Sequence, residues 1–288
     1  MPKTPSTQRV RLGNRRVTGK EQYYTPTETA IALVSELMYL VPDLANRTIL
    51  EPAGGTGAFI EAARAVGATK FVAFDIEPKH IDVSPGDFLL QDLSLAGAVA
   101  LSNPPFGRNN SLSIPFFNRA AEHCHYIAFI VPRSWRKWSV TNRLNRNFHL
   151  VADHDLQLDY VDAAGARLSE RKRLATCFQI WERRSELRPL IAVADQGLIT
   201  KTTPDSADVA LTIFGYGCGT VRTEFERKPN STRMFLKLNH PDALASLQTA
   251  DFARFFRNTA YTEALSLQEV NYLLNSAILG NPHLVEIG

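Results

Sequence analysis

The feature that most constrains the fold is a regular alternation of strand-length apolar runs and segments with helical spacing. The apolar runs occur at 48–51, 70–77, 95–101 and 125–132. Segments whose apolar residues recur at helical spacing lie before and between them, at 31–40, 59–66 and 116–124. Strands that alternate with helices favour a mostly parallel sheet covered on both faces. The sequence therefore predicts a doubly wound α/β fold, closed by two further strands at 149–159 and 173–183.

Chain length and a change of pattern after residue 185 predict more than one folded part. With 288 residues, of which 44% are hydrophobic, the chain can bury a full core and carry a second, smaller region. Beyond residue 185 the alternation stops, and a glycine-containing hairpin followed by a strand and two helical segments favours a small α+β region. We expect a basic flexible arm at 1–20, a catalytic domain at 21–185 and a substrate- or target-recognition region at 186–288.

Composition predicts a cytoplasmic protein with no membrane segment. Apolar runs such as 126–131 are far shorter than the roughly 20 residues that span a bilayer. The N-terminus lacks the apolar stretch of a signal peptide. Three scattered cysteines are too few for a disulfide framework, which agrees with a reducing compartment.

Chemically suggestive residues follow the ends of the predicted strands, where ligands bind in sheets of this kind. The glycine-rich turn from Glu51 to Gly57 lets a ligand approach the backbone, although a merely tight turn gives the same pattern. Asp75 ends the next strand and can accept hydrogen bonds from both hydroxyls of a ribose, with Glu77 as the competitor for that role.

Two further motifs follow. Asp87 and Phe88 pair an acceptor for an exocyclic amine with a ring that can stack on a purine. Alternatively, Asp87 caps a turn before a core phenylalanine. The sequence NPPF at 103–106 follows the apolar run at 95–101, and its alternative interpretation is a rigid turn with a packed aromatic ring.

The order of EPAGGTGAF, FDIEP, GDF and NPPF resembles the Rossmann-like, class I S-adenosylmethionine-dependent amino-methyltransferases, in particular the DNA adenine-N6 methylases. The resemblance extends over residues 22–182 and includes YYTPTE at 23–28, which is similar to the TP-containing N-terminal motif of that family. It implies S-adenosylmethionine as the cofactor and no metal ion. The cofactor-binding residues that it implies are Tyr24, Thr25, Pro26, Glu51, Pro52, Ala53, Gly55, Gly57, Asp75, Ile76, Asp87, Phe88 and Asn103. The catalytic residues that it implies are Asn103, Pro104, Pro105 and Phe106.

This resemblance gives the NPPF residues a chemical role. The N6 of adenine is a poor nucleophile because its lone pair is delocalised into the ring. The side-chain carbonyl of Asn103 and the main-chain carbonyl of Pro104 offer two acceptors that favour a more tetrahedral nitrogen, and the prolines carry no competing N–H. Phe106 would stack on the target base, which must leave a duplex to reach the pocket.

Three further expectations concern the neighbouring segments. Thr25, Pro26 and Glu28 predict a helix start, with Thr25 as N-cap and Glu28 completing a capping box. The stretch 108–146 is strongly basic, with only Glu122 as an acid. The nucleic-acid contacts that we expect in it are Arg108, Arg133, Arg136, Lys137 and Trp135. Alternatively, the tryptophans are core residues and the cations are solvated.

The sequence therefore favours methyl transfer to adenine N6 in DNA, either in a duplex with a flipped base or in a single strand. RNA is the alternative substrate, through adenine N6 or guanine N2, because an RNA methylase would use the same four motifs. No feature of the sequence indicates recognition of a 2′-hydroxyl. Two more alternatives stay open: a protein glutamine methylase, and a non-catalytic nucleic-acid-binding subunit with the same fold. The protein fits a restriction-modification or phage context, and the sequence leaves the oligomeric state open.

Overall fold

The computed structural model describes residues 23–162, 164–167 and 174–287. The basic arm expected at 1–20 lies outside the described residues. The chain divides into two compact units, which are described separately: the first contains residues up to 130 together with 158–173, and the second contains 131–157 and the rest of the chain from 174. The domain boundary expected between residues 185 and 186 stays a prediction.

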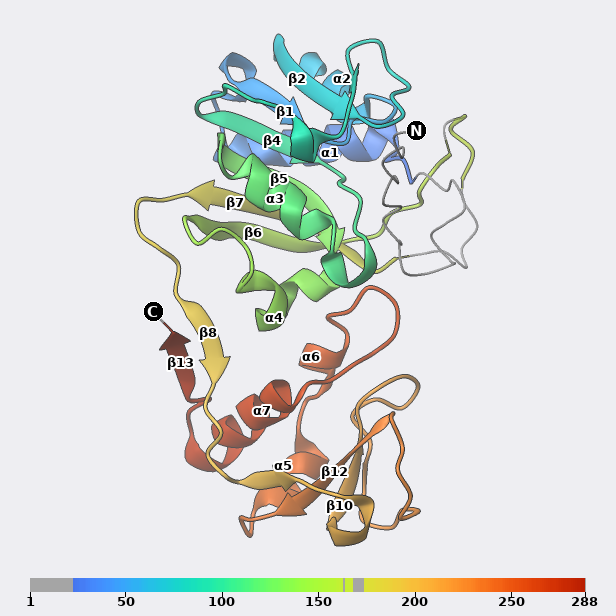
Figure 1. Cartoon of the computed structure of the whole chain (residues 1–288), viewed down its shortest axis with the longest axis vertical. Helices are drawn as coiled ribbons and strands as arrows, with labels where there is room; N and C mark the ends of the chain where they lie inside the picture. Colours follow the sequence, from blue (N-terminus) through green and yellow to red (C-terminus); the bar gives the residue numbers. More distant parts are fainter. Residues whose placement is uncertain (1–22, 163, 168–173, 288) are drawn as a thin grey trace, which may run out of the picture. The chain divides into compact units, whose positions relative to one another are not determined.

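A seven-stranded sheet has the order β3-β2-β1-β4-β5-β7-β6 (Figure 1). Its strands are β1 (Thr48–Glu51), β2 (Lys70–Asp75), β3 (Ser84–Pro85), β4 (Ala98–Ser102), β5 (Cys124–Pro132), β6 (Phe148–Leu156) and β7 (Thr176–Arg183). The pairings from β3 through β5 are parallel, and β6 pairs with β7 in antiparallel fashion. The predicted α/β class with a mostly parallel sheet is confirmed.

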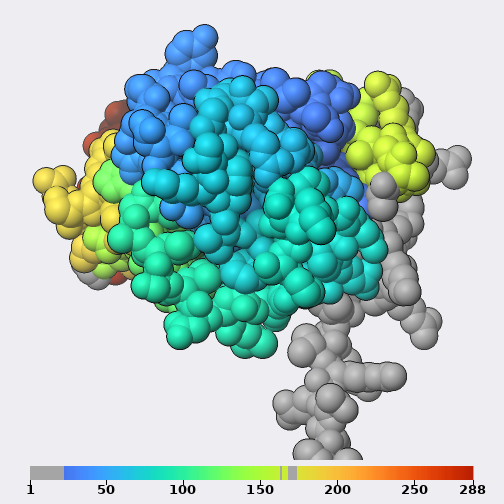
Figure 2. Space-filling model, turned by 90° about the horizontal axis from the view of Figure 1, so that it is seen from above, coloured from blue at the N-terminus to red at the C-terminus, as the bar shows by residue number. Residues whose placement is uncertain are grey.

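Burial explains why β1 and β4 are continuous apolar runs in the sequence. Every residue of β4 is buried, and so are the last three residues of β1. The unit contains α1 (Thr27–Leu40), α2 (Ala58–Ala65) and α3 (Ser113–Ala120). Helices α1 and α2 pack against each other, and α1 buries Ala30, Leu33, Val34 and Leu37 on one side. In the space-filling view the segments from α1 to α3, coloured blue to green, form one continuous surface (Figure 2).

The strand order creates a switch point between β1 and β4. From β1 the chain proceeds outward to β2 and β3, and then returns to place β4 on the other side of β1. Loops at the carboxyl ends of two such strands lead away in opposite directions and leave a crevice between them. Glu51 ends β1 and Ser102 ends β4, so the glycine turn and the NPPF motif both begin at this crevice.

The second unit adds a separate four-stranded antiparallel sheet with the order β11-β10-β12-β9. These strands are β9 (Ile199–Lys201), β10 (Val209–Thr212), β11 (Val221–Arg222) and β12 (Arg233–Leu238). Its helices are α4 (Trp138–Thr141), α5 (Ala243–Thr249), α6 (Ala253–Phe256) and α7 (Leu267–Leu279). A two-stranded sheet pairs β8 (Leu190–Val193) with β13 (Leu284–Ile287). The hairpin, strand and helices predicted after residue 185 are therefore present.

Among the described residues, no helix combines the length and the apolar character that crossing a membrane requires.

Candidate active site

The site is built on a hydrogen bond that joins the ends of β1 and β4. The Ser102 hydroxyl donates to Oε1 of Glu51, and the backbone N–H of Ala53 donates to the same oxygen at 3.1 Å. Glu51 is only 2% exposed. No hydrogen bond to its second oxygen is recorded among the described residues. A buried carboxyl group whose Oε1 accepts two hydrogen bonds therefore lines the crevice.

The electrostatic state of Glu51 follows from this position. Burial, with a smaller contribution from the negative charge of nearby Asp75, raises the pKa of Glu51 from 4.5 to about 8. The hydrogen bonds from Ser102 and Ala53 oppose the rise, because they favour the carboxylate. Near neutral pH the group is thus mostly protonated until a cation approaches it.

The glycine turn after β1 has the backbone freedom that the sequence indicates. Gly55 and Gly57 have φ of +46° and +79°, in the left-handed region that disfavours other residues. A Cβ on Gly55 would lie 2.7 Å from Cε1 of Tyr24, and one on Gly57 would lie 2.4 Å from Cδ2 of His80. Only glycine fits at either position without displacing a ring.

Asp75 is tied to the glycine turn through both carboxylate oxygens. Oδ2 accepts from the N–H of Gly55 and Oδ1 accepts from the N–H of Glu77, each at 2.8 Å. Each oxygen keeps a second lone pair, so the carboxylate can still accept two hydroxyl groups. The N–H of Gly54 donates to the carbonyl of Phe74 at 2.8 Å, which holds the turn against the end of β2.

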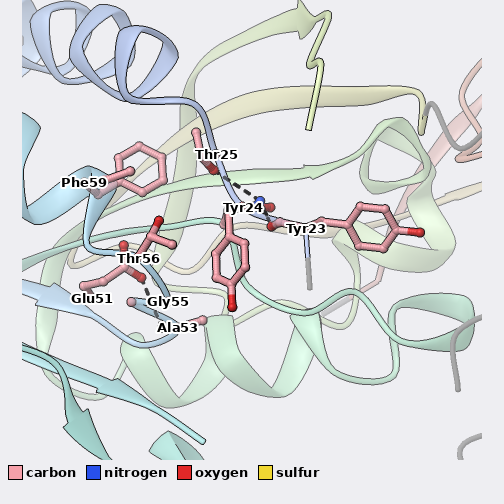
Figure 3. A pocket seen from close by; sticks show the side chains of 11 residues that line it. Tyr23, Tyr24, Thr25, Glu51, Ala53, Gly55, Thr56 and Phe59 are labelled. Carbon is pink, nitrogen blue, oxygen red and sulfur yellow. Dashed lines mark hydrogen bonds between the residues drawn. The ribbon is translucent and has the colours of Figure 1, made fainter. Parts of the chain in front are cut away.

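Residues 23–25 form the opposite wall of the pocket (Figure 3). The ring of Tyr24 extends toward Gly55 and Ala53, while Tyr23 packs edge-on against Tyr160 with ring centroids 5.2 Å apart. Burial raises the pKa of the Tyr24 hydroxyl, and the charges of Asp75 and Glu77 add to the rise. The pocket therefore lies between the tyrosines and the glycine turn.

The predicted cap of the first helix is wrong. Helix α1 begins at Thr27, its N-cap is Pro26, and no side chain caps it. The hydroxyl of Thr25 instead accepts a hydrogen bond from Nδ2 of Asn103 at 3.3 Å. Thr25 thus serves a tertiary contact to the NPPF motif, which competes with the local capping interaction.

The contacts of Asn103 determine the positions of the nitrogen and the oxygen of its side-chain amide. Nδ2 of Asn103 also donates to the main-chain carbonyl of Tyr23 at 3.4 Å. Because a carbonyl oxygen only accepts, the group that faces it must be the NH₂. The side-chain carbonyl of Asn103 is therefore left as an acceptor, and among the described residues no donor to it is recorded.

The other residues of the NPPF motif differ in exposure. Pro104 is buried, Pro105 is exposed and Phe106 is half-buried. The main-chain carbonyl of Phe106 accepts from the N–H groups of Leu112 and Ser113, at 3.2 and 3.3 Å. These bonds turn the chain back after the motif and hold the Phe106 backbone beside the start of α3.

Asp87 and Phe88 adopt the arrangement of the structural alternative. Oδ1 of Asp87 accepts from the N–H of Leu89 at 3.0 Å and so caps a short 3-10 helix. Phe88 is 1% exposed and packs against Phe74 and Phe116. Ile76, by contrast, is mostly exposed. The expected cofactor contacts of Asp87, Phe88 and Ile76 stay predictions.

Most of the expected nucleic-acid contacts are engaged within the second unit. Arg133 pairs with Asp155, Arg136 with Asp153 and Asp155, and Lys137 with the buried carboxylate of Glu269, at 2.6 to 3.0 Å. Trp135 is completely buried, so its ring has no face to offer a base, as the core alternative states. Arg108 is exposed, and no ion pair of its side chain is recorded among the described residues.

Sequence reasoning also missed a small ionic cluster behind the glycine turn. Ligand atoms of Glu61, His80 and Asp82 lie within 4.8 Å of one another. Arg64 pairs with both carboxylates, and its contact to Asp82 is 2.7 Å long. The Arg64 guanidinium already pairs with both acids, so the cluster is an ion-pair network that packs against Gly57 through the His80 ring.

The residues around the site that the sequence did not single out include Ser102 and five residues that line the pocket: Tyr23, Gly54, Thr56, Ala58 and Phe59. The only sequence signal for them is their adjacency to the recognised motifs. Ser102 and Tyr23 contact residues distant in the chain, Glu51 and Tyr160 respectively.

No protein-family model matches the chain, and no curated protein matches it. A candidate RNA methyltransferase of Pyrococcus horikoshii is 19% identical over 57% of this chain and 87% of its own, with a TM-score of 0.45. A candidate class I S-adenosylmethionine-dependent methyltransferase of Listeria monocytogenes is 16% identical over 57% of this chain and 64% of its own, with a TM-score of 0.41. The modification subunit of a candidate type I restriction enzyme of Vibrio vulnificus is 14% identical over 63% of this chain and 49% of its own, with a TM-score of 0.40. All three scores lie below 0.5, so the functional argument depends on the residues of the site itself.

Proposed function

We propose that the chain transfers a methyl group from S-adenosylmethionine to the N6 amino group of adenine in DNA. The observation that carries the proposal is the orientation of Asn103 at the β1–β4 switch point. Its NH₂ is bound to Tyr23 and Thr25, which leaves its carbonyl oxygen as an acceptor at the pocket. A fixed acceptor suits an amine that must be held and polarised.

The residues of the crevice fit the two polar ends of this cofactor. A cationic group of the cofactor beside the buried side chain of Glu51 would restore its carboxylate, whose second oxygen could then accept a hydrogen bond. The two oxygens of Asp75 keep lone pairs for the hydroxyls of a ribose. Bound there, S-adenosylmethionine would supply a methyl group on a positively charged sulfur.

The chain's own residues would then prepare the amine. The carbonyl of Asn103 accepts one N–H of the adenine amine, and the main-chain carbonyl of Pro104 accepts the other. The two acceptors would direct the nitrogen lone pair out of the ring toward the methyl group that bound S-adenosylmethionine would supply, and the proton that the amine gives up on methylation would pass to solvent water. Phe106, half-buried beside Pro105, has ring surface available for stacking on the base.

The test incubates the full chain with labelled S-adenosylmethionine and, in parallel, unmethylated duplex DNA, single-stranded DNA and total RNA, followed by nucleoside analysis. We expect N6-methyldeoxyadenosine. Asn103→Ala should bind the cofactor as the wild type does and lose turnover by at least about a hundredfold, within the range for removing one preorganised contact. Asp75→Ala should instead weaken cofactor binding.

The outcomes separate the alternatives. Labelled ribonucleosides would transfer the substrate to RNA. Cofactor binding without transfer to any nucleic acid would contradict the proposal in favour of a protein substrate or a non-catalytic subunit. Equal loss of cofactor affinity in Asn103→Ala would refute the role assigned to its carbonyl.

A further inference from the structure

The four-stranded sheet of the second unit has two chemically different faces. One face carries Val209, Leu211, Met234 and Leu236, which belong to the main apolar core of this region. Successive residues of a strand alternate between faces, so their neighbours Ala210, Thr212, Arg233, Phe235 and Lys237 point the other way. Arg222 is aligned with Ala210 and joins this second face.

The second face is cationic. Arg222 and Lys237 are exposed, Arg233 is half-buried, and no ion pair of these three side chains is recorded among the described residues. Phe225 covers the centre by packing on Phe235, with ring centroids 5.7 Å apart. Arg222, Arg233 and Lys237 are called the cationic face below.

Neighbouring cations in the same region behave differently. Arg227 donates through Nη1 to the carbonyls of Pro204, Asp205 and Ala207, at 2.8 to 3.1 Å. Lys228 is exposed and pairs with Glu226 at 2.7 Å. The contrast matters, because a cation that already has a partner gains less from a phosphate than one that has none.

Two exposed aromatic rings lie in the loop that leaves the sheet after Thr212, the residue aligned with Arg233, and leads to the strand that carries Arg222. The loop 213–220 joins β10 to β11, and in it Tyr216 is fully exposed and Phe214 is 50% exposed. Backbone hydrogen bonds hold the loop. The N–H of Gly215 donates to the carbonyl of Glu263 at 2.9 Å, and the N–H of Gly219 donates to the carbonyl of Thr212 at 2.8 Å. A hydrogen-bonded loop thus presents two solvent-exposed rings.

We propose that Arg222 and Arg233 of the cationic face bind the phosphates of a single-stranded stretch of nucleic acid, and that Tyr216 and Phe214 stack on its unpaired bases. Unpaired guanidinium groups bind phosphates, and exposed rings stack on bases of any sequence. A duplex keeps its bases stacked inside, so the rings favour a single strand. This inference rests on the proposed function for the identity of the partner, and it extends that function to a named surface.

The test measures binding of a labelled single-stranded DNA of mixed sequence to the full chain by fluorescence anisotropy, without cofactor, over a salt series. We expect Arg222→Ala and Arg233→Ala each to lower the affinity several-fold and to reduce the salt slope by about one unit. Arg222→Lys and Arg233→Lys should keep most of the affinity. Lys228→Ala removes the same charge from an exposed but paired position and should change binding less than twofold.

The aromatic contribution has its own control. Tyr216→Ala should lower single-strand affinity by about fivefold or more, whereas Tyr216→Phe should restore it, because stacking needs only the ring. Tyr39→Ala removes a tyrosine that is 88% exposed on α1 and should leave binding unchanged. Circular dichroism confirms that each variant is folded.

Two results would overturn the proposal. One is equal binding by wild type, Arg222→Ala and Tyr216→Ala; the other is a loss in Lys228→Ala or Tyr39→Ala as large as theirs. Methyl transfer that persists alongside either result would leave the proposed function standing. Conversely, binding that depends on Arg222 and Tyr216 in a chain that transfers no methyl group would retain this surface and refute the activity.

Discussion

Replacing Glu51 by glutamine should change how the stability of the protein depends on pH. Glutamine has the same shape and still accepts hydrogen bonds from Ala53 and Ser102, but it cannot ionise. In the wild type the pKa is 4.5 when unfolded and about 8 when folded, so the unfolded chain binds fewer protons between these values. Stability is therefore unaffected below pH 4.5 and falls as the pH rises toward 8.

The size of the effect follows from the shift. One pKa unit corresponds to about 1.4 kcal/mol, so the contribution of Glu51 should weaken the wild type by about 2.5 kcal/mol between pH 5 and pH 7. The Glu51→Gln variant lacks this pH-dependent loss of stability, because glutamine does not ionise. The free energy of unfolding is measured in urea for both proteins from pH 5 to pH 8. As the pH rises, the variant should become increasingly more stable than the wild type.

All other titratable groups are the same in the two proteins, so their contributions cancel in the difference between the two free energies of unfolding. Glu28→Gln makes the same substitution at an exposed position in the first turn of α1 and is the matched control. A constant difference between wild type and Glu51→Gln across this range would refute the buried, mostly protonated state of Glu51. Addition of S-adenosylmethionine should narrow the difference at high pH if its cation restores the carboxylate.

Three further substitutions test other parts of the structure. Thr25→Val removes one acceptor from the Asn103 amide and should lower kcat about tenfold at unchanged cofactor affinity, with rescue by Thr25→Ser; a change in affinity alone would contradict this. Lys137→Ala leaves the Glu269 carboxylate buried without its cation and should destabilise the fold by about 3 kcal/mol in urea unfolding; weaker nucleic-acid binding at unchanged stability would contradict that ion pair. Gly57→Ala should lower the melting temperature, because φ is +79° and the added Cβ meets an imidazole ring; an unchanged melting temperature would show that the turn relaxes.

The elements of the fold were predictable because each carries a local signal. Apolar runs mark β1, β2, β4 and β5, and the glycines after β1 mark a turn that needs positive φ. The α+β character of the second region was also readable from its glycine hairpin and amphipathic helices. These signals depend on neighbours within a few residues of one another.

The role of Thr25 was not predictable in the same way. Its sequence context fits an N-cap, and the capping interaction is local. The hydroxyl contacts Asn103 instead, which lies 78 positions away in the chain. Sequence spacing gives no information about which of two such partners a hydroxyl will take once the fold brings the second one near.

The basic stretch at 108–146 shows the same limit for charge. Within the stretch Glu122 is the only acid, so the cations look available for phosphates. Asp153 lies 17 positions beyond Arg136, and Glu269 lies 132 positions beyond Lys137, yet both form ion pairs with them. The number of basic residues in the stretch therefore overstated how many cations are available to bind phosphates.

The sequence by itself determined the α/β class, the glycine turn and the position of the NPPF motif at a strand end, because these depend on periodicity and on residue types with restricted backbones. Only the tertiary structure showed that Glu51 is buried against Ser102 and that the side-chain carbonyl of Asn103 remains as an acceptor at the pocket. It also showed which arginines have no recorded ion pair among the described residues. Burial, hydrogen-bond partners and ion pairs are properties of segments that meet in space, and the folded chain alone brings them together.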